Sequence, residues 1–216
     1  MLLGSRNGLI AEANKEELMY KQALQNWLDL FAGRLTTFVD DTMEDLSFPL
    51  FYQTATPIKY RVDFTLTALK TISSRNSFFT SCAKTISCPN LITIIGAQHF
   101  QGSSSLESVS FPNLETIDNF SWYFFNCTAL KTVNLGKVQS LPSAVNNSFA
   151  YDTSLTDVFV ESMQSDTLLS YTQMLSSATT GSFTPHQVVF HCADGDVVWS
   201  DDDNAWVIAS DRKSVV

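Results

Sequence analysis

The most constraining feature of this sequence is a short apolar phrase that returns at an almost constant interval. Residues 86–94 read ISCPNLITI and residues 109–117 read VSFPNLETI, so that Pro112 takes the place of Pro89 in the second copy. A repeat of this length is typical of a solenoid, because one unit is too short to bury its own apolar face and must stack on its neighbours. The sequence therefore predicts an elongated stack with an extended surface, which suits binding better than an enclosed active site.

Weaker copies of the phrase continue the pattern along the chain. Residues 68–72 match residues 90–94, and residues 106–111 return as residues 130–135 and again as residues 155–160. The interval between copies drifts, which indicates single insertions at the turns between units. We expect about five units over residues 35–160, with irregular units at the two ends because each of these faces solvent on one side.

Within each unit, an alternating segment predicts a strand. Val109 and Phe111 alternate with serines, and this period of two is that of a strand with one buried face. The aromatic residues that follow, such as Tyr123 and Phe124, are predicted to fill the core of the stack.

One stretch of the sequence carries a resemblance to a known family. Residues 106–118 read LESVSFPNLETID and are followed by an aromatic stretch and the turn Asn126-Cys127-Thr128. This phrase resembles the BspA-type leucine-rich repeats, and the match covers about half of the chain. The resemblance implies a right-handed leucine-rich β-solenoid used for adhesion to proteins or glycans, in a family of binding proteins rather than enzymes.

The chain departs from the family pattern at two points. Residues 123–125 (Tyr-Phe-Phe) and residues 99–100 (His-Phe) stand where the family usually has Ala-Phe, and only one unit keeps the cysteine at the turn, as Cys127. These departures preserve the predicted fold and leave the ligand open.

The N-terminal segment, residues 1–34, is predicted to be helical. Polar and apolar residues alternate at three- and four-residue spacing over residues 10–35, which is typical of an amphipathic helix. We expect this helix to cap the first repeat with Trp27 and Phe31. The alternative is association. A second apolar set lies partly off that stripe, and in this alternative it faces another subunit of a homo-oligomer or a larger assembly; its members are Leu18, Leu24, Leu28 and Phe31.

Residues 161–216 are predicted to form a C-terminal cap. A helix is expected over residues 165–176, followed by three short strands at residues 188–192, 196–199 and 205–209. Asp194-Gly195 is a tight-turn signal, so the strands are expected to form a small antiparallel β-meander. The whole chain is thus predicted to be a mostly β, α/β-class leucine-rich repeat solenoid with a helical N-terminal cap and a C-terminal helix plus meander.

Charge and hydropathy exclude two classes of partner. The formal net charge is −9 and the pI is about 4.6, whereas binding to a phosphate backbone requires a basic surface, so nucleic acid is not expected as a partner. No apolar stretch reaches the length of about 18 residues that a membrane span needs, so membrane insertion is not expected either. The first residues also lack the pattern of a secretory signal.

The four cysteines leave two alternatives open. Cys88 and Cys127 fall inside the repeat pattern, which favours buried free thiols. A disulfide between Cys82 and Cys88 is the other alternative, although nothing in the sequence requires an oxidising compartment.

Metal binding is not predicted, although one acidic turn is a candidate site for Ca²⁺. Residues 201–204 (Asp-Asp-Asp-Asn), with Asp194 and Asp196 nearby, carry oxygen ligands that Ca²⁺ accepts, but they lack the alternate spacing of a calcium loop. The histidines also lack the spacing of a zinc site and are expected to be core or surface residues; they are His99, His186 and His191.

Catalysis is not predicted either. The sequence contains no phosphate-binding loop, nucleophile elbow or dinucleotide fingerprint, so we expect no cofactor and no catalytic residue. A glycan-degrading protein remains a minor alternative. Glycoside hydrolysis requires a pair of carboxylates, and Glu115, Asp118 and Asp157 lie in repeat turns that could place two of them side by side across the stack.

The solvent-facing strand positions are the candidate binding surface. They carry neutral polar and charged side chains between the buried apolar positions, and a bacterial surface protein or glycan is the expected partner. The residues are Lys70, Glu107, Ser108, Ser110, Lys131, Thr132, Asn134, Thr156 and Asp157.

The C-terminal end of the chain indicates a location for the protein. Residues 191–196 read HCADGD, and this end is similar to those of leucine-rich proteins encoded by gut-bacterial phages and prophages. The similarity implies a tail-associated virion protein that also contacts other virion proteins, which would reach the outside by lysis without a signal peptide. A bacterial cell-surface adhesin, or an interaction scaffold of the same repeat family, is the alternative.

Overall fold

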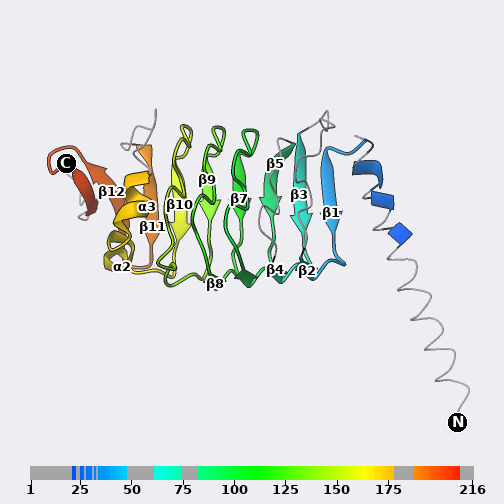
Figure 1. Cartoon of the computed structure of the whole chain (residues 1–216), viewed down its shortest axis with the longest axis horizontal. Helices are drawn as coiled ribbons and strands as arrows, with labels where there is room; N and C mark the ends of the chain where they lie inside the picture. Colours follow the sequence, from blue (N-terminus) through cyan, green and yellow to red (C-terminus); the bar gives the residue numbers. More distant parts are fainter. Residues whose placement is uncertain are drawn as a thin grey trace, which may run out of the picture.

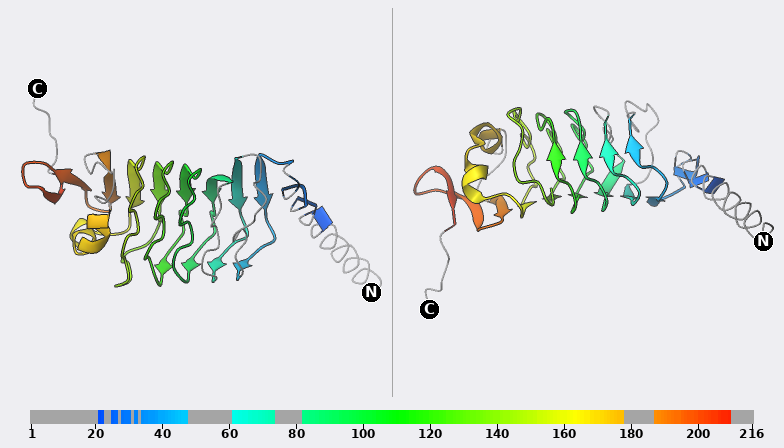
Figure 2. Two further views of the ribbon diagram at one scale, coloured as in Figure 1. Left: turned by 45° about the horizontal axis from the view of Figure 1, so that its top comes forward. Right: turned by 90° about the horizontal axis from the view of Figure 1, so that it is seen from below.

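The chain forms an elongated β-solenoid, in which strands from successive turns run side by side (Figure 1). The computed structural model describes residues 21–22, 25–26, 28–30, 32, 34–47, 61–73, 82–177 and 187–209. The views in Figure 2 show the row of turns, with the C-terminal strands and helices at one end and a helical segment at the other. The predicted fold class, a mostly β solenoid, is therefore confirmed.

Most of the strands belong to one nine-stranded sheet with the order β1-β3-β5-β7-β9-β10-β11-β12-β13. All neighbours from β1 to β11 are parallel. The strands are β1 (Thr37–Asp40), β3 (Val62–Leu66), β5 (Ala83–Ser87), β7 (Ser108–Ser110), β9 (Thr132–Asn134), β10 (Asp157–Val160), β11 (Val189–Cys192), β12 (Asp196–Ser200) and β13 (Ala205–Ile208).

A second sheet contains the other strand of the early turns. Its order is β2-β4-β6-β8, and its strands are likewise parallel. They are β2 (Asp45–Leu46), β4 (Thr71–Ile72), β6 (Thr93–Ile94) and β8 (Thr116–Ile117). Each of these turns therefore presents two faces, one on each sheet.

The apolar positions of the repeat point between the two sheets. Strand β3 alternates buried Val62, Phe64 and Leu66 with partly exposed residues, and Val109 and Val133 take the same buried place in β7 and β9. The period of two in the sequence thus corresponds to one buried and one solvent-facing side of each strand.

Aromatic rings form a column through the core of the stack. The ring of Phe124 lies parallel to that of Phe100, with centroids 5.1 Å apart, and to that of Phe149 at 5.6 Å. The column continues through Phe190, which meets Phe149 edge-on at 6.1 Å, to Trp206. The predicted use of aromatic residues as core fill is confirmed.

The repeated Pro-Asn-Leu phrase has a structural role in stacking. The side-chain amide of Asn90 donates to the carbonyl of Thr67 (2.7 Å), and that of Asn113 donates to the carbonyl of Pro89 (2.8 Å). Each asparagine therefore ties its own turn to the preceding one, while the leucine that follows it, Leu91 or Leu114, is buried.

Two buried polar side chains, Asp152 and Cys127, take part in hydrogen bonds that link successive turns. Asp152 lies in the turn that follows Cys127, and its Oδ1 accepts a hydrogen bond from the Cys127 backbone N–H at 2.7 Å. Cys127 Sγ in turn donates to the carbonyl of Phe100 at 2.9 Å. Desolvation of the buried carboxyl raises the pKa of Asp152 well above its ordinary value.

Of the two alternatives for the cysteines, the structure contains the buried thiols. Cys88 and Cys127 are free and fully buried. Since Cys88 is a free thiol, it forms no disulfide with Cys82. Each histidine was expected to be a core or a surface residue, and His99 lies in the core, where burial lowers its pKa to about 4, so the ring is neutral near pH 7.

The C-terminal part differs from the expectation in two details. Two short helices, α2 (Ser165–Leu169) and α3 (Thr172–Ser177), replace the single predicted helix. Between them Tyr171 turns back to the solenoid, where its hydroxyl accepts from the N–H of Leu141 and donates to its carbonyl, both at 2.8 Å. The antiparallel meander β11-β12-β13 is confirmed, but β11 also pairs with β10 in parallel, so the stack extends past residue 160.

The described residues of the N-terminal segment are helical up to Leu30. Residues 21–22, 25–26 and 28–30 are helical, and Leu30 is fully buried in the core. Of the predicted association residues, Leu28 is 53% exposed, while Leu18, Leu24 and Phe31 lie outside the described residues. In the described part of the chain, none of the helices has the length and apolar character needed to cross a membrane.

Candidate functional site

The outward face of the nine-stranded sheet presents two rows of aligned side chains. Because parallel strands stack in register, equivalent residues of successive turns lie next to one another, about 4.8 Å apart. The first row consists of Thr37, Asp63, Thr85, Ser108, Thr132, Asp157 and Val189. The second consists of Val39, Thr65, Ser87, Ser110, Asn134, Phe159 and His191.

The structure brings five of the nine predicted binding residues into these rows. Ser108, Thr132 and Asp157 are neighbours in the first row, and Ser110 and Asn134 are neighbours in the second. All five are partly exposed. They form a mainly neutral surface of hydroxyl and amide groups.

Three more of the predicted residues flank this surface. Glu107, Lys131 and Thr156 immediately precede β7, β9 and β10, and they are linked by backbone hydrogen bonds from one turn to the next. Glu107 pairs with Lys131 (3.4 Å) and with Arg61 (3.5 Å). Their charges are therefore partly neutralised by one another.

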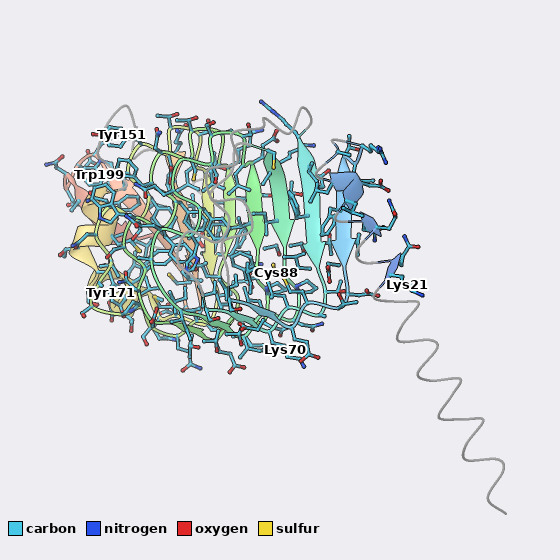
Figure 3. The ribbon with its side chains drawn as sticks, turned by 45° about the vertical axis from the view of Figure 1, so that its right-hand side comes forward. Lys21, Lys70, Cys88, Tyr151, Tyr171 and Trp199 are labelled. Carbon is cyan, nitrogen blue, oxygen red and sulfur yellow. The ribbon has the colours of Figure 1, made fainter. Side chains whose placement is uncertain are left out.

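The ninth predicted residue belongs to a different surface. Lys70 precedes β4 in the four-stranded sheet and pairs with Glu44 at 3.0 Å. Figure 3 shows Lys70 at the edge of the molecule opposite to Tyr151. Lys70 is thus separated from the rows of the nine-stranded sheet.

His191 lies between two carboxylates at the C-terminal end of the rows. Its Nε2 is 3.0 Å from Asp157 Oδ1, and its Nδ1 is 3.0 Å from Asp196 Oδ1. The ring also stacks on Phe159, with centroids 4.4 Å apart and planes 17° apart. Each ring nitrogen thus faces one carboxylate oxygen. This arrangement is expected for a protonated histidine, in which both nitrogens carry a hydrogen that they can donate.

Phe159 and His191 were not among the residues predicted from the sequence. Phe159 had a detectable signal, because an aromatic residue stands there at an outward position that the three preceding units fill with Ser or Asn. His191 had none, because it enters the row only through the parallel pairing of β11 with β10.

The two carboxylates change the protonation of His191. Partial burial lowers the pKa of His191, but the hydrogen bonds to Asp157 and Asp196 outweigh it, so that the pKa lies above the usual 6.5. The hydrogen bond from His191, with a second from Thr156, holds the pKa of Asp157 below its ordinary value.

We expect this cluster to make the stability of the protein depend on pH. Because the pKa of His191 is raised in the folded state, His191 stabilises the fold fully below pH 6.5, and this contribution is lost as the pH rises through the raised pKa. Because the pKa of Asp157 is lowered, Asp157 stabilises the fold above about pH 4. The difference in unfolding free energy between wild type and His191→Gln should therefore be largest between about pH 4 and 6.5. Urea denaturation across this range measures it.

An NMR titration of the His191 imidazole is the direct control. In the Asp157→Asn/Asp196→Asn double variant its pKa should fall, because both carboxylates have been neutralised. A wild-type pKa at or below 6.5 would contradict the prediction.

The carboxylates considered for glycoside hydrolysis are not brought together. Glu115 and Asp118 flank β8 in the four-stranded sheet, whereas Asp157 begins β10 in the nine-stranded sheet. Asp118 Oδ1 accepts a hydrogen bond from the Gly96 N–H at 2.6 Å, which indicates a role in turn structure.

The acidic residues near the C-terminus also have separate structural partners. Asp194 accepts hydrogen bonds from the Ser165 N–H (2.7 Å) and hydroxyl (3.0 Å), and Asp203 accepts one from the Ser200 hydroxyl at 2.8 Å. Among the residues that the structure describes, no three His, Cys, Asp or Glu side chains are grouped so that they could hold a metal ion.

A shallow groove extends the sheet face at the C-terminal hairpin. The pairing of β11, β12 and β13 places Val198 and Val207 next to Val189 at the end of the first row. These three valines line the groove together with Asp196 and Trp199. Asp201, Asp202 and Asp203 line the same groove, so the surface at this end combines a strip of valines with acidic side chains.

Comparison with known proteins agrees with the repeat architecture. The family model for the BspA type leucine rich repeat region matches residues 68–183 in six copies, which is more than half of the chain. Repeats of this kind typically serve as binding scaffolds, and no catalytic family is indicated. No curated protein and no solved structure matches the chain.

Proposed function

Because the chain belongs to the BspA-type leucine-rich repeat family, we propose that it is a non-enzymatic recognition module whose nine-stranded sheet face binds a protein on a bacterial surface. The observation that carries this proposal is the pair of aligned rows on that face. They offer hydroxyl and amide groups at a regular spacing, with Phe159 as an aromatic anchor beside them. Protein interfaces commonly combine such an anchor with a polar surround.

We further propose that the protein is a component of a phage tail. The similarity of residues 191–196 to the ends of phage-encoded leucine-rich proteins supports this assignment, and exposed Leu28 offers an apolar contact for a second copy or another virion protein. Immunogold labelling of virions tests it. Labelling of intact bacteria in the absence of phage would favour the alternative, a bacterial cell-surface adhesin or interaction scaffold.

The sheet face can be tested by a combined substitution. We expect Ser108→Ala, Ser110→Ala, Thr132→Ala and Phe159→Ala together to weaken binding to host cells by about tenfold or more, because an aromatic anchor and its polar surround are removed. Asn134 is left intact, since its side-chain oxygen accepts a hydrogen bond from the Gly136 N–H at 2.8 Å and holds a turn. Binding of the fluorescently labelled protein to cells measures the effect.

A matched control lies on the four-stranded sheet. Ile92, Ile95 and Glu115 are exposed there, and their replacement by alanine should leave cell binding unchanged. If the two combined variants bind equally well, the nine-stranded sheet face is not the binding face. If periodate treatment of the cells abolishes binding and protease treatment does not, the partner is a surface glycan instead of a protein.

A further inference from the structure

The irregular segments that lead into the strands of the nine-stranded sheet stack on one another at one edge of the solenoid. In the turns before β9 and β10 the N–H of Trp122 donates to the carbonyl of Asn146 at 2.8 Å, and that of Asn126 donates to the carbonyl of Ala150 at 2.9 Å. The preceding turn joins the same ladder, where the N–H of Gly102 donates to the carbonyl of Phe125. Equivalent residues of the three turns therefore occupy equivalent backbone positions.

Two of these positions have a left-handed backbone in each of the three turns. The first is occupied by Gln98, Trp122 and Asn147, with φ of 64°, 58° and 54°. The second is occupied by Gly102, Asn126 and Tyr151, with φ of 73°, 61° and 65°.

Glycine and asparagine are the usual residues in this conformation, and a bulky aromatic residue is a genuine outlier. The stacking of the turns requires the left-handed backbone, but it does not require an aromatic side chain at Trp122 or Tyr151, because the equivalent positions hold Gln, Asn or Gly. Strained residues of this kind cluster at functional sites.

The rings of Trp122 and Tyr151 both contact Phe125 at the surface. Phe125 lies between them, with ring centroids 4.7 Å from Trp122 and 5.3 Å from Tyr151. Tyr151 is 42% exposed, and the other two rings are partly exposed. We call these three residues the aromatic cluster; Figure 3 shows Tyr151 at the edge opposite to Lys70.

The three turns that carry the aromatic cluster are almost free of charged residues. The sequence has no Asp, Glu, Lys or Arg between Lys84 and Glu107, between Asp118 and Lys131, or in residues 138–151, although the net charge of the whole chain is −9. These three stretches supply the three stacked turns. Their polar groups are instead amides and hydroxyls, including the exposed side chains of Asn126 and Asn146.

From these observations we propose that the aromatic cluster binds a neutral oligosaccharide, at a surface distinct from the sheet face. A sugar ring has an apolar face of C–H groups that packs on aromatic rings, whose negative faces attract the polarised hydrogens. Its hydroxyls need neutral donors and acceptors, which the neighbouring asparagines supply. In the described part of the chain, the indole N–H of Trp122 and the hydroxyl of Tyr151 have no hydrogen-bond partner, so both remain available to a ligand.

The test uses residues that the neighbouring turns already contain. Trp122→Asn introduces the residue found at the equivalent position of the next turn, Asn147, and Tyr151→Asn introduces the residue found at that of the preceding turn, Asn126. Both variants therefore suit a left-handed backbone. We expect each variant to retain or raise the thermal melting temperature and to weaken saccharide binding about tenfold or more. Maltoheptaose, cellohexaose and chitohexaose are the neutral probes, and hyaluronan is the charged comparison; isothermal titration calorimetry measures binding.

The combined variant of the sheet face is the matched control and should keep full saccharide binding, so that the two surfaces are tested independently. The proposal is overturned if none of the three neutral probes binds at millimolar concentrations, or if hyaluronan binds as well as they do. It is also overturned if the Asn variants bind like wild type and melt at lower temperature, which would assign the rings to structure alone.

Discussion

Replacing Phe124 by alanine is expected to lower the free energy of unfolding by about 3–5 kcal/mol. The Phe124 ring is fully buried and lies nearly parallel to Phe100 and Phe149, with interplanar angles of 9° and 5°. Its removal leaves a cavity in the aromatic column, and the hydrogen-bonded turns on either side cannot close that cavity. Urea denaturation followed by far-UV circular dichroism measures the loss.

The adjacent residue provides the control for this prediction. Phe125 has the same side chain and belongs to the same turn, but it is partly exposed in the aromatic cluster. We expect Phe125→Ala to cost about 1 kcal/mol, because little buried volume is lost. Equal losses in the two variants would show that the aromatic column does not stabilise the stack.

A second large loss of stability is expected for Gly136→Ala. Gly136 has a φ of +57°, and a Cβ placed there would come within 2.6 Å of the backbone carbon and oxygen of Pro112 in the preceding turn. The side chain would therefore both strain the backbone of Gly136 and push two turns apart. We expect a loss of about 3 kcal/mol or more, of which left-handed strain accounts for about 1–2 kcal/mol; thermal and urea denaturation measure it.

Two further glycine substitutions separate strain from steric overlap. Gly136→Asn suits the left-handed backbone but adds the same Cβ, so it should remain strongly destabilised. Gly195→Ala adds a Cβ whose nearest neighbour, Ile208 Cγ2, is at an ordinary contact distance of 3.7 Å, while φ is +150°. A larger effect at Gly195 than at Gly136 would contradict the role given to the close approach of Pro112.

Much of the solenoid could be predicted because its causes are local and repeated. The alternation around Val109 and the recurring Pro-Asn-Leu phrase both act at every turn, so that several copies of the signal support one interpretation. The same repetition identified the outward strand positions, and Ser108, Ser110, Thr132 and Asn134 indeed share one face of the nine-stranded sheet.

The predictions failed where the two strands of one turn could not be told apart, and where the repeat phrase is missing from the sequence. Lys70 was grouped with the residues of the nine-stranded sheet, because the short second strand of each turn could not be separated from the first by periodicity alone. The extension of the stack by β11 was missed because residues 161–188 separate it from β10, and they contain no clear copy of the Pro-Asn-Leu phrase.

The sequence by itself determined the stack: its period and apolar spacing leave no other way to bury the repeated leucines, isoleucines and aromatic residues. Only the tertiary structure decided which unrepeated residues meet. His191 reaches Asp157, and Phe125 reaches Tyr151, through the register of stacked turns, although each pair is far apart in the sequence. That register depends on backbone hydrogen bonds between turns of unequal length, and these are not encoded in the period of any single turn.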